Sequence, residues 1–129
     1  MKNKRLCKLF ARLLGGSLEM TDEMCSVSKR KNIKVTIFGR RTNSPLVVYH
    51  RFSFELIDRK GRALNLGQVV VLKSEIIPFV YQLQKSGIKV SLHNHWLNTN
   101  PRLTHIHFQS VDNPIIFALK IRKAMRLIK

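Results

Sequence analysis

Alternation of apolar and polar residues with a period of two is the feature that most restricts how this chain can fold. In NIKVTIFG, residues 32–39, the apolar side chains Ile33, Val35 and Ile37 are separated by polar ones. This is the pattern of a β-strand with one buried face. The same pattern, or a short apolar run bounded by turn residues, recurs along the chain. We therefore expect strands at residues 24–28, 32–39, 46–58, 66–72, 88–95 and 102–109.

Helical periodicity is confined to three segments. The first is predicted over residues 4–14, where leucines recur on one side and Gly15-Gly16 ends the helix. The second is predicted to begin after Ser74 as N-cap and to end at Gly87. Its first turn should contain Glu75, which suits the helix dipole, and Pro78, whose missing N–H is tolerated there.

The last helix is predicted to begin at Pro114, after a cap at Asp112 or Asn113. Strands therefore dominate, with a helix near each end and one between. This order predicts an α+β fold, a mostly antiparallel sheet covered on one face by about three helices. A chain of 129 residues has the size of one domain, so we expect a single domain over residues 1–129.

The charge balance is strongly basic, with 24 Lys and Arg against 7 Asp and Glu and a net charge of +17. Such a field attracts polyanions, so non-specific binding to nucleic acid is expected. The basic amphipathic helix at 4–14 could instead lie on an anionic membrane surface. No stretch reaches the ~18 apolar residues of a membrane span, and the N-terminus lacks the apolar run of a secretory signal. We therefore expect no transmembrane segment and a cytoplasmic location.

The two cysteines, Cys7 and Cys25, do not form a C-x-x-C pair, which argues against a zinc knuckle. They are either buried thiols or one disulfide, and we favour thiols. Other common motifs are absent, including the nucleotide-binding glycine loops and the G-x-S-x-G serine elbow. These absences leave nucleotide binding by such loops and serine-nucleophile chemistry without support.

Four of the five histidines fall in one stretch, SLHNHWLNTNPRLTHIHFQ, residues 91–109. They are His93, His95, His105 and His107. On strands, both members of each H-x-H pair point to one face. The connection from Trp96 to Arg102 is short enough for antiparallel neighbours, and opposite residues then lie about 5 Å apart. The four imidazoles therefore converge if the register agrees, and the sequence does not fix the register.

Imidazole is a common ligand for zinc, copper, nickel and iron, and a catalytic metal needs about three protein ligands. His93, His95 and His107 would meet that count, with zinc as the first guess. Glu75 would be a further ligand or a base. One alternative is a polar sheet surface, which is also our expectation for His50.

An anion site is the other alternative, in which the histidines and Arg102 hold a carboxylate or phosphate. Trp96 would line such a pocket, or it would simply pack against the protein.

The residues EIIPFVYQLQKSGIKVSLHNHWLNTNPRLTHIHF, followed by DNPIIFALKIRKAM, resemble the LppY/LpqO-homologue domain of unknown function. That family shows an acidic residue ahead of a helix proline, a Gly-Ile-x-Val strand, an HNH motif, Pro-Arg and a later histidine. The resemblance is specific in the C-terminal half and looser in the N-terminal part. It implies a site made from Glu75, His93, His95, Arg102 and His107, with Asn94 of the HNH motif as a further ligand-binding residue.

The chain departs from the family pattern at three positions. Ile77 replaces an asparagine, His105 replaces an aromatic residue, and Gln68 stands where the family tends to carry an acid. The resemblance therefore implies that His105 is incidental to the site and that a second carboxylate is missing.

The residue pattern leaves two functions open. The first is a His-rich site on the sheet that binds a metal or a small anionic ligand, with hydrolase or lyase activity as its catalytic version. Histidines suit proton transfer near neutral pH because their ordinary pKa is about 6.5. The second is a basic module that binds nucleic acid or an anionic membrane surface without catalysis.

Overall fold

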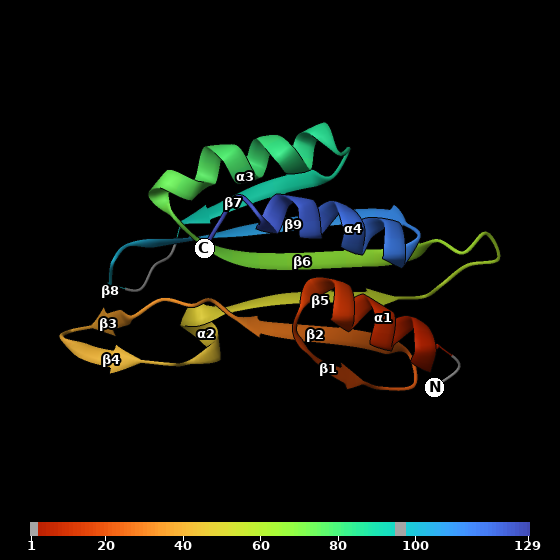
Figure 1. Cartoon of the computed structure of the whole chain (residues 1–129), viewed down its shortest axis with the longest axis horizontal. Coiled ribbons are helices and arrows are strands. Elements are labelled where there is room, and N and C mark those ends of the chain that lie inside the picture. The colour runs from red at the N-terminus through yellow and green to blue at the C-terminus, as the bar shows by residue number, and fades with distance from the viewer. Residues whose placement is uncertain (1–2, 95–97) are drawn as a thin grey trace.

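The computed structural model describes residues 3–94 and 98–129, and the side chains of residues 93 and 94 are not described. Its main element is a six-stranded antiparallel sheet with the strand order β1-β2-β5-β6-β9-β7 (Figure 1). The strands are β1 (Ser17–Met20), β2 (Met24–Arg30), β5 (Tyr49–Glu55), β6 (Ala63–Leu72), β9 (Leu103–Asp112) and β7 (Lys89–Asn94).

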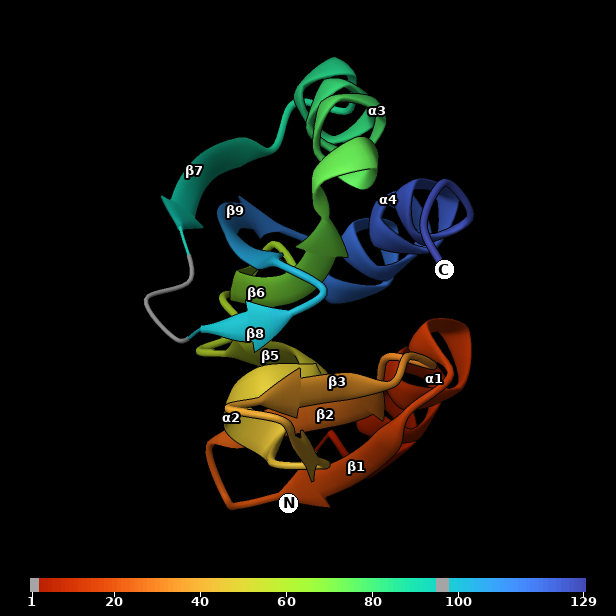
Figure 2. The same cartoon turned by 90° about the vertical axis from the view of Figure 1, so that its left-hand side faces the viewer.

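Three long helices, α1 (Lys4–Leu14), α3 (Lys73–Lys85) and α4 (Pro114–Met125), cover one face of this sheet (Figure 2). Their apolar sides pack on inward-facing strand residues in one core. Phe10 of α1, for example, makes an edge contact with Phe54, with ring centroids 4.9 Å apart. The predicted α+β fold is thus confirmed.

A smaller second layer covers one end of the opposite face. It contains the three-stranded sheet β4-β3-β8, formed by β3 (Val35–Ile37), β4 (Arg40–Thr42) and β8 (Thr99–Asn100), and the short helix α2 (Pro45–Val48). A separate apolar cluster fills the space beneath it, comprising Val35, Val47, Val48, Val70 and Leu103. None of the helices in the described part of the chain lies over the rest of that face of the large sheet (Figure 2). We call this uncovered part the open face.

Local chemistry explains where most elements begin and end. Gly15, Gly61 and Gly87 all have positive φ, and Gly87 ends α3 with Ile88 N–H donating to Leu83 O at 3.0 Å. Asn113 caps α4 by accepting from Ile115 N–H at 2.8 Å. The helix bounds predicted from glycine and Asn-Pro signals are therefore confirmed at these ends.

The predicted long strand over 46–58 is wrong at its start. The Ser44 side chain accepts from Leu46 N–H at 3.2 Å and Pro45 occupies the first helical position, so residues 45–48 form α2 and β5 begins only at Tyr49. The strand predicted over residues 32–39 shrinks to Val35–Ile37 and belongs to the small sheet. In both places turn chemistry overrode the apolar pattern.

The start of α3 also differs from the prediction. The helix begins at Lys73, so Ser74 lies inside it, and the Glu75 carboxylate accepts from Leu72 N–H at 2.8 Å instead. Pro78 lies inside the helix beyond its first turn. Glu75, at the third helical position, thus accepts from the N–H of the residue before the helix, which is a different contact from the N-cap role predicted for Ser74.

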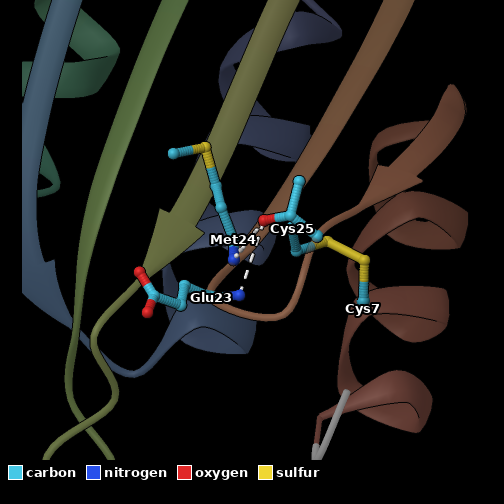
Figure 3. Close-up of a disulfide and its surroundings, with 5 residues drawn as sticks. Cys7, Glu23, Met24 and Cys25 are labelled. Atoms are coloured by element: carbon cyan, nitrogen blue, oxygen red, sulfur yellow. Dashed lines mark hydrogen bonds between the residues drawn. A yellow bond between two sulfur atoms is a disulfide. The ribbon is translucent and has the colours of Figure 1, made fainter.

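The prediction of free thiols is wrong, because Cys7 and Cys25 form a buried disulfide (Figure 3). Cys7 lies on the sheet-facing side of α1 and Cys25 on the helix-facing side of β2, with their Cα atoms 5.6 Å apart. This distance is typical of disulfides. The bond joins positions 18 residues apart, and closing a loop of that size contributes about 3 kcal/mol to stability.

Candidate functional site

A row of polar residues crosses the open face from one edge of the sheet to the other. Cα pairing places Ser17 opposite Ser28, Ser28 opposite Arg51, and Arg51 opposite Gln68. Gln68 in turn is opposite His107, and His107 is opposite Ser91. Directly opposite residues share one face and lie about 5 Å apart. The register therefore assembles one polar side chain from each of the six strands into a continuous line.

The middle of this row lies in a cleft of about 470 Å³. Arg51, Gln68 and His107 line it, together with Glu19. Three hydroxyl side chains from β2 and β5 also line the cleft: Ser26, Ser28 and Ser53. The cleft thus offers a guanidinium, a carboxylate, an amide, an imidazole and three hydroxyls, which is a donor-rich lining for a polar ligand.

A smaller hollow of about 180 Å³ adjoins the cleft and is lined by Lys89, Ser91 and Gln109. His107 and Gly67 line both hollows. Gly67 has no side chain because Phe108, opposite it, packs against its Cα, and any added Cβ would collide with that ring. The missing Cβ of Gly67 would point to the helix-covered side, where Phe108 lies. On the open face, His107 lies where the two hollows meet and is opposite Gln68.

His105 and His107 share the open face of β9, with ring centroids 6.5 Å apart. The Gln68 amide nitrogen lies 3.1 Å from His105 Nδ1. Gln68 is the residue that stands in place of the family acid, and here it connects the cleft to His105. His105, which the resemblance implied to be incidental to the site, therefore lies within hydrogen-bond distance of a cleft residue.

The predicted antiparallel pairing of the two histidine strands is confirmed. The Cα of His93 is opposite that of His105, and Asn94 is opposite Thr104. Nothing further is described for the side chains of His93 and Asn94, and His95 and Trp96 lie outside the described residues. Of the three predicted metal ligands, only His107 has a described side chain.

Glu75 does not line the cleft. It is buried, and its Oε1 accepts from the ammonium of Lys31 at 2.9 Å, while its Oε2 accepts from Lys129 N–H at 2.6 Å. Burial by itself would raise the pKa of Glu75, but the backbone N–H groups of Leu72 and Lys129 and the Lys31 ammonium together lower it below the usual value. Glu75 is therefore an ionised residue engaged in a buried ion pair.

His50, expected to be polar surface, is fully buried, so that expectation is wrong. It shares the helix-covered side of β5 with Phe52 and Phe54, and its Nδ1 accepts from Val70 N–H at 3.1 Å. Burial, and then the positive charges of Lys31 and Lys29, lower the pKa of His50 to about 3. It is a neutral core residue on the opposite side of the sheet from His105 and His107.

Arg102 lies just before β9, is exposed, and lines neither hollow. Arg51 supplies a guanidinium to the cleft instead, and the sequence analysis did not select it. The alternation in β5 could have identified it, because Arg51 and Ser53 occupy the positions between the buried Phe52 and Phe54.

Among residues 3–92 and 98–129, no three His, Cys, Asp or Glu side chains are grouped as a metal site would require. Within the same part of the chain, none of the helices has both the length and the apolar character needed to cross a membrane.

Residues 8–127 match the sequence profile of a family described as Domain of Unknown Function (DUF1259). No curated protein matches the chain, and no solved structure matches it.

Proposed function

The chain belongs to the family of the Domain of Unknown Function DUF1259, and we propose that it binds a small anionic ligand in the cleft on its open face. One observation carries this proposal. Arg51, Gln68 and His107 occupy directly opposite positions on β5, β6 and β9, and all three line the same cleft.

The lining chemistry supports an anion that also carries hydroxyl groups. The Arg51 guanidinium presents paired donors that match a carboxylate or phosphate. Gln68 lies beside it and His107 beside Gln68, and both add further hydrogen-bonding groups. The three cleft serines and the Glu19 carboxylate can pair with ligand hydroxyls. Hydroxy acids and sugar phosphates combine both features.

The finer family relation, to the LppY/LpqO homologues, is also a proposal. It rests on the HNH motif at residues 93–95, on Arg102 and on His107. In that proposal Asn94 and Trp96 are ligand-binding residues. Hydrolase or lyase chemistry at the same histidines stays a prediction, and turnover of a bound hydroxy acid would check it.

Ligand titrations followed by backbone NMR test the proposal. The probes are gluconate, citrate, glucose 6-phosphate and inorganic phosphate. We expect at least one probe to shift the amide signals of Arg51, Ser53, Gln68 and His107. A hydrogen bond to a charged group contributes about 1.5–3 kcal/mol, so Arg51→Gln should weaken binding at least tenfold.

The matched control is Arg59→Gln, which removes the same charge from an exposed position in the β5–β6 loop. It should leave the affinity within about twofold, because exposed charges beyond a Debye length of about 8 Å are screened. Equal losses of ligand affinity in Arg51→Gln and Arg59→Gln would contradict a cleft site. So would NMR signal shifts confined to residues outside the cleft.

A divalent metal held by His93, His95 and His107, with zinc first, is a second candidate. The register favours it, because His93 is opposite His105 and therefore diagonal to His107. Diagonal neighbours on one sheet face lie about 7–8 Å apart, a distance that two long side chains can span to hold one metal ion.

Metal content of the untagged protein tests this candidate. Alanine at any of the three ligands should remove the metal without unfolding the chain, and occupancy should fall as pH drops and the imidazoles protonate. His105→Ala should retain the metal. If His105→Ala loses it and His95→Ala does not, the ligand set is wrong.

A further inference from the structure

The outer side of α1 and α4 is a second surface with its own chemistry, across the sheet from the cleft. The two helices pack side by side (Figure 1). Neither contains an aspartate or glutamate. Seven basic residues on or just beyond them are exposed: Lys4, Arg5, Lys8, Arg12, Arg122, Lys123 and Arg126. Seven of the 24 Lys and Arg residues of the chain are therefore exposed on or just beyond these two helices. Asp112, just before α4, pairs with Lys120 and with none of these seven.

A groove of about 310 Å³ lies between the C-terminal ends of these helices. Four cations line it, Arg12 from α1, Lys29 from β2, and Arg122 and Arg126 from the end of α4, and its lining includes no acid. The Lys29 ammonium lies close to Gly15, so this charge is held against the end of α1.

None of these four cations forms an ion pair within residues 3–92 and 98–129, where the ion pairs are Lys31–Glu75, Arg62–Asp58 and Lys120–Asp112. Like charges around one groove repel each other. A bound anion relieves that repulsion, and a phosphate can accept from several guanidinium donors at once.

Apolar side chains are exposed among these cations. Leu9 is 39% exposed, Leu119 49% and Leu127 47%. Leu9 precedes Arg12 by three residues, and Leu119 precedes Arg122 by three, so each leucine lies beside a cation on its helix. Leucines contribute nothing to contacts with a nucleic-acid backbone. They do gain free energy at the boundary between lipid headgroups and acyl chains, where basic amphipathic helices bind.

We propose that this surface, the α1–α4 surface, docks the protein on an anionic lipid bilayer. It comprises the four groove cations with Lys8, Lys123 and the three exposed leucines. Lipid phosphates occupy the groove between Arg12 and Arg126, and the leucines enter the headgroup boundary. The helices lie along the membrane surface, and the cleft on the other side of the sheet faces the water.

Sedimentation with lipid vesicles tests the proposal. The vesicles contain phosphatidylcholine alone or with about 30% phosphatidylglycerol, in about 150 mM salt, where the Debye length is about 8 Å. We expect binding only to the anionic vesicles. Each basic residue near an anionic surface contributes about fivefold in affinity, so the double variant Arg122→Gln/Arg126→Gln should bind about 30-fold more weakly.

The matched charge control is Arg59→Gln/Lys60→Gln, which removes two exposed charges from the β5–β6 loop. It should change vesicle affinity by less than about threefold, because screening limits distant charges. Equal losses in the two double variants would mean that vesicles respond only to net charge, and the proposed surface would be wrong.

The leucines separate a membrane from a nucleic acid as the partner. Leu119→Gln/Leu127→Gln should weaken vesicle binding about tenfold. Val111→Gln, which changes an even more exposed apolar residue on the open face, should not. Tight binding to duplex DNA in the same salt, with no vesicle binding and no effect of the leucine changes, would overturn the proposal. Circular dichroism checks that each variant remains folded.

Discussion

The two faces of the six-stranded sheet are built from the same strands in alternation, yet their chemistry is opposite. In β5, Phe52 and Phe54 enter the helix-covered core, while Arg51 and Ser53 face the cleft. In β9, Ile106 and Phe108 are buried in that core, while His107 lines the cleft. The requirement for a core fixes one residue in two along each strand, and the remaining residues are free to form a site.

Each face also has an exception near the end where the small sheet lies. Beneath β3 and α2, Val70 and Leu103 of the otherwise open face are buried in the second apolar cluster. At this same end of the covered side, the polar residues Lys31, His50 and Glu75 are buried, and each has a hydrogen-bond partner. Whether a strand residue is buried therefore depends on which face of the sheet it points to and also on whether a helix or the small sheet covers that part of the face.

The largest loss of stability should come from breaking the buried ion pair on the covered side. Lys31→Met leaves the Glu75 carboxylate buried without its cation, which should lower the free energy of unfolding by about 3–5 kcal/mol. Denaturant unfolding measures the change. Arg62→Met is the control, because it removes the exposed pair with Asp58 and should cost less than about 1 kcal/mol. Similar losses in both variants would show that the Lys31–Glu75 pair is not protected from water.

A smaller effect should appear as pH falls, through His50. Its folded pKa of about 3 lies below the ordinary 6.5, so between these values the unfolded chain binds one more proton than the folded chain. Stability should therefore fall with decreasing pH below 6.5, by up to about 1.4 kcal/mol per pH unit from this residue. His50→Asn keeps an acceptor for Val70 N–H and cannot titrate.

The comparison is best made between pH 4.5 and 6.5. Glu75 also has a lowered pKa, but its contribution is lost only as pH falls below about 4.5. Thermal unfolding across this window should give a flatter dependence for His50→Asn than for the original chain. Parallel curves would mean that His50 is not a buried neutral residue.

The smallest effect on stability should come from the open face. Arg51→Gln and His107→Ala change cleft side chains that belong to neither apolar cluster. Each should alter the free energy of unfolding by about 0.5 kcal/mol or less. A loss of several kcal/mol from either would show that the cleft residues support the fold, and a ligand-binding role would lose its basis.

Residue pattern predicted much of the fold. The residue pattern located five of the six strands of the large sheet and missed β1. Glycine and Asn-Pro signals located the helix ends at Gly15, Gly87 and Asn113. The histidine strands were correctly expected to pair antiparallel. The prediction of His50 as surface was wrong. Glu75, which the sequence placed among the catalytic groups, lies outside the cleft in a buried ion pair, and Arg51 of the cleft was not selected.

What the sequence by itself determined is the alternation, and with it the chemistry of each strand's two sides. Only the tertiary structure decided which residues from different strands meet. The register placed Gln68 opposite both Arg51 and His107, and the packing of α1 on β2 brought Cys7 to Cys25. The same packing of distant segments put Lys31 against Glu75, 44 positions away along the chain. Local periodicity depends on neighbouring residues, whereas these contacts depend on loop lengths and on how helices dock, which no single stretch of the chain encodes.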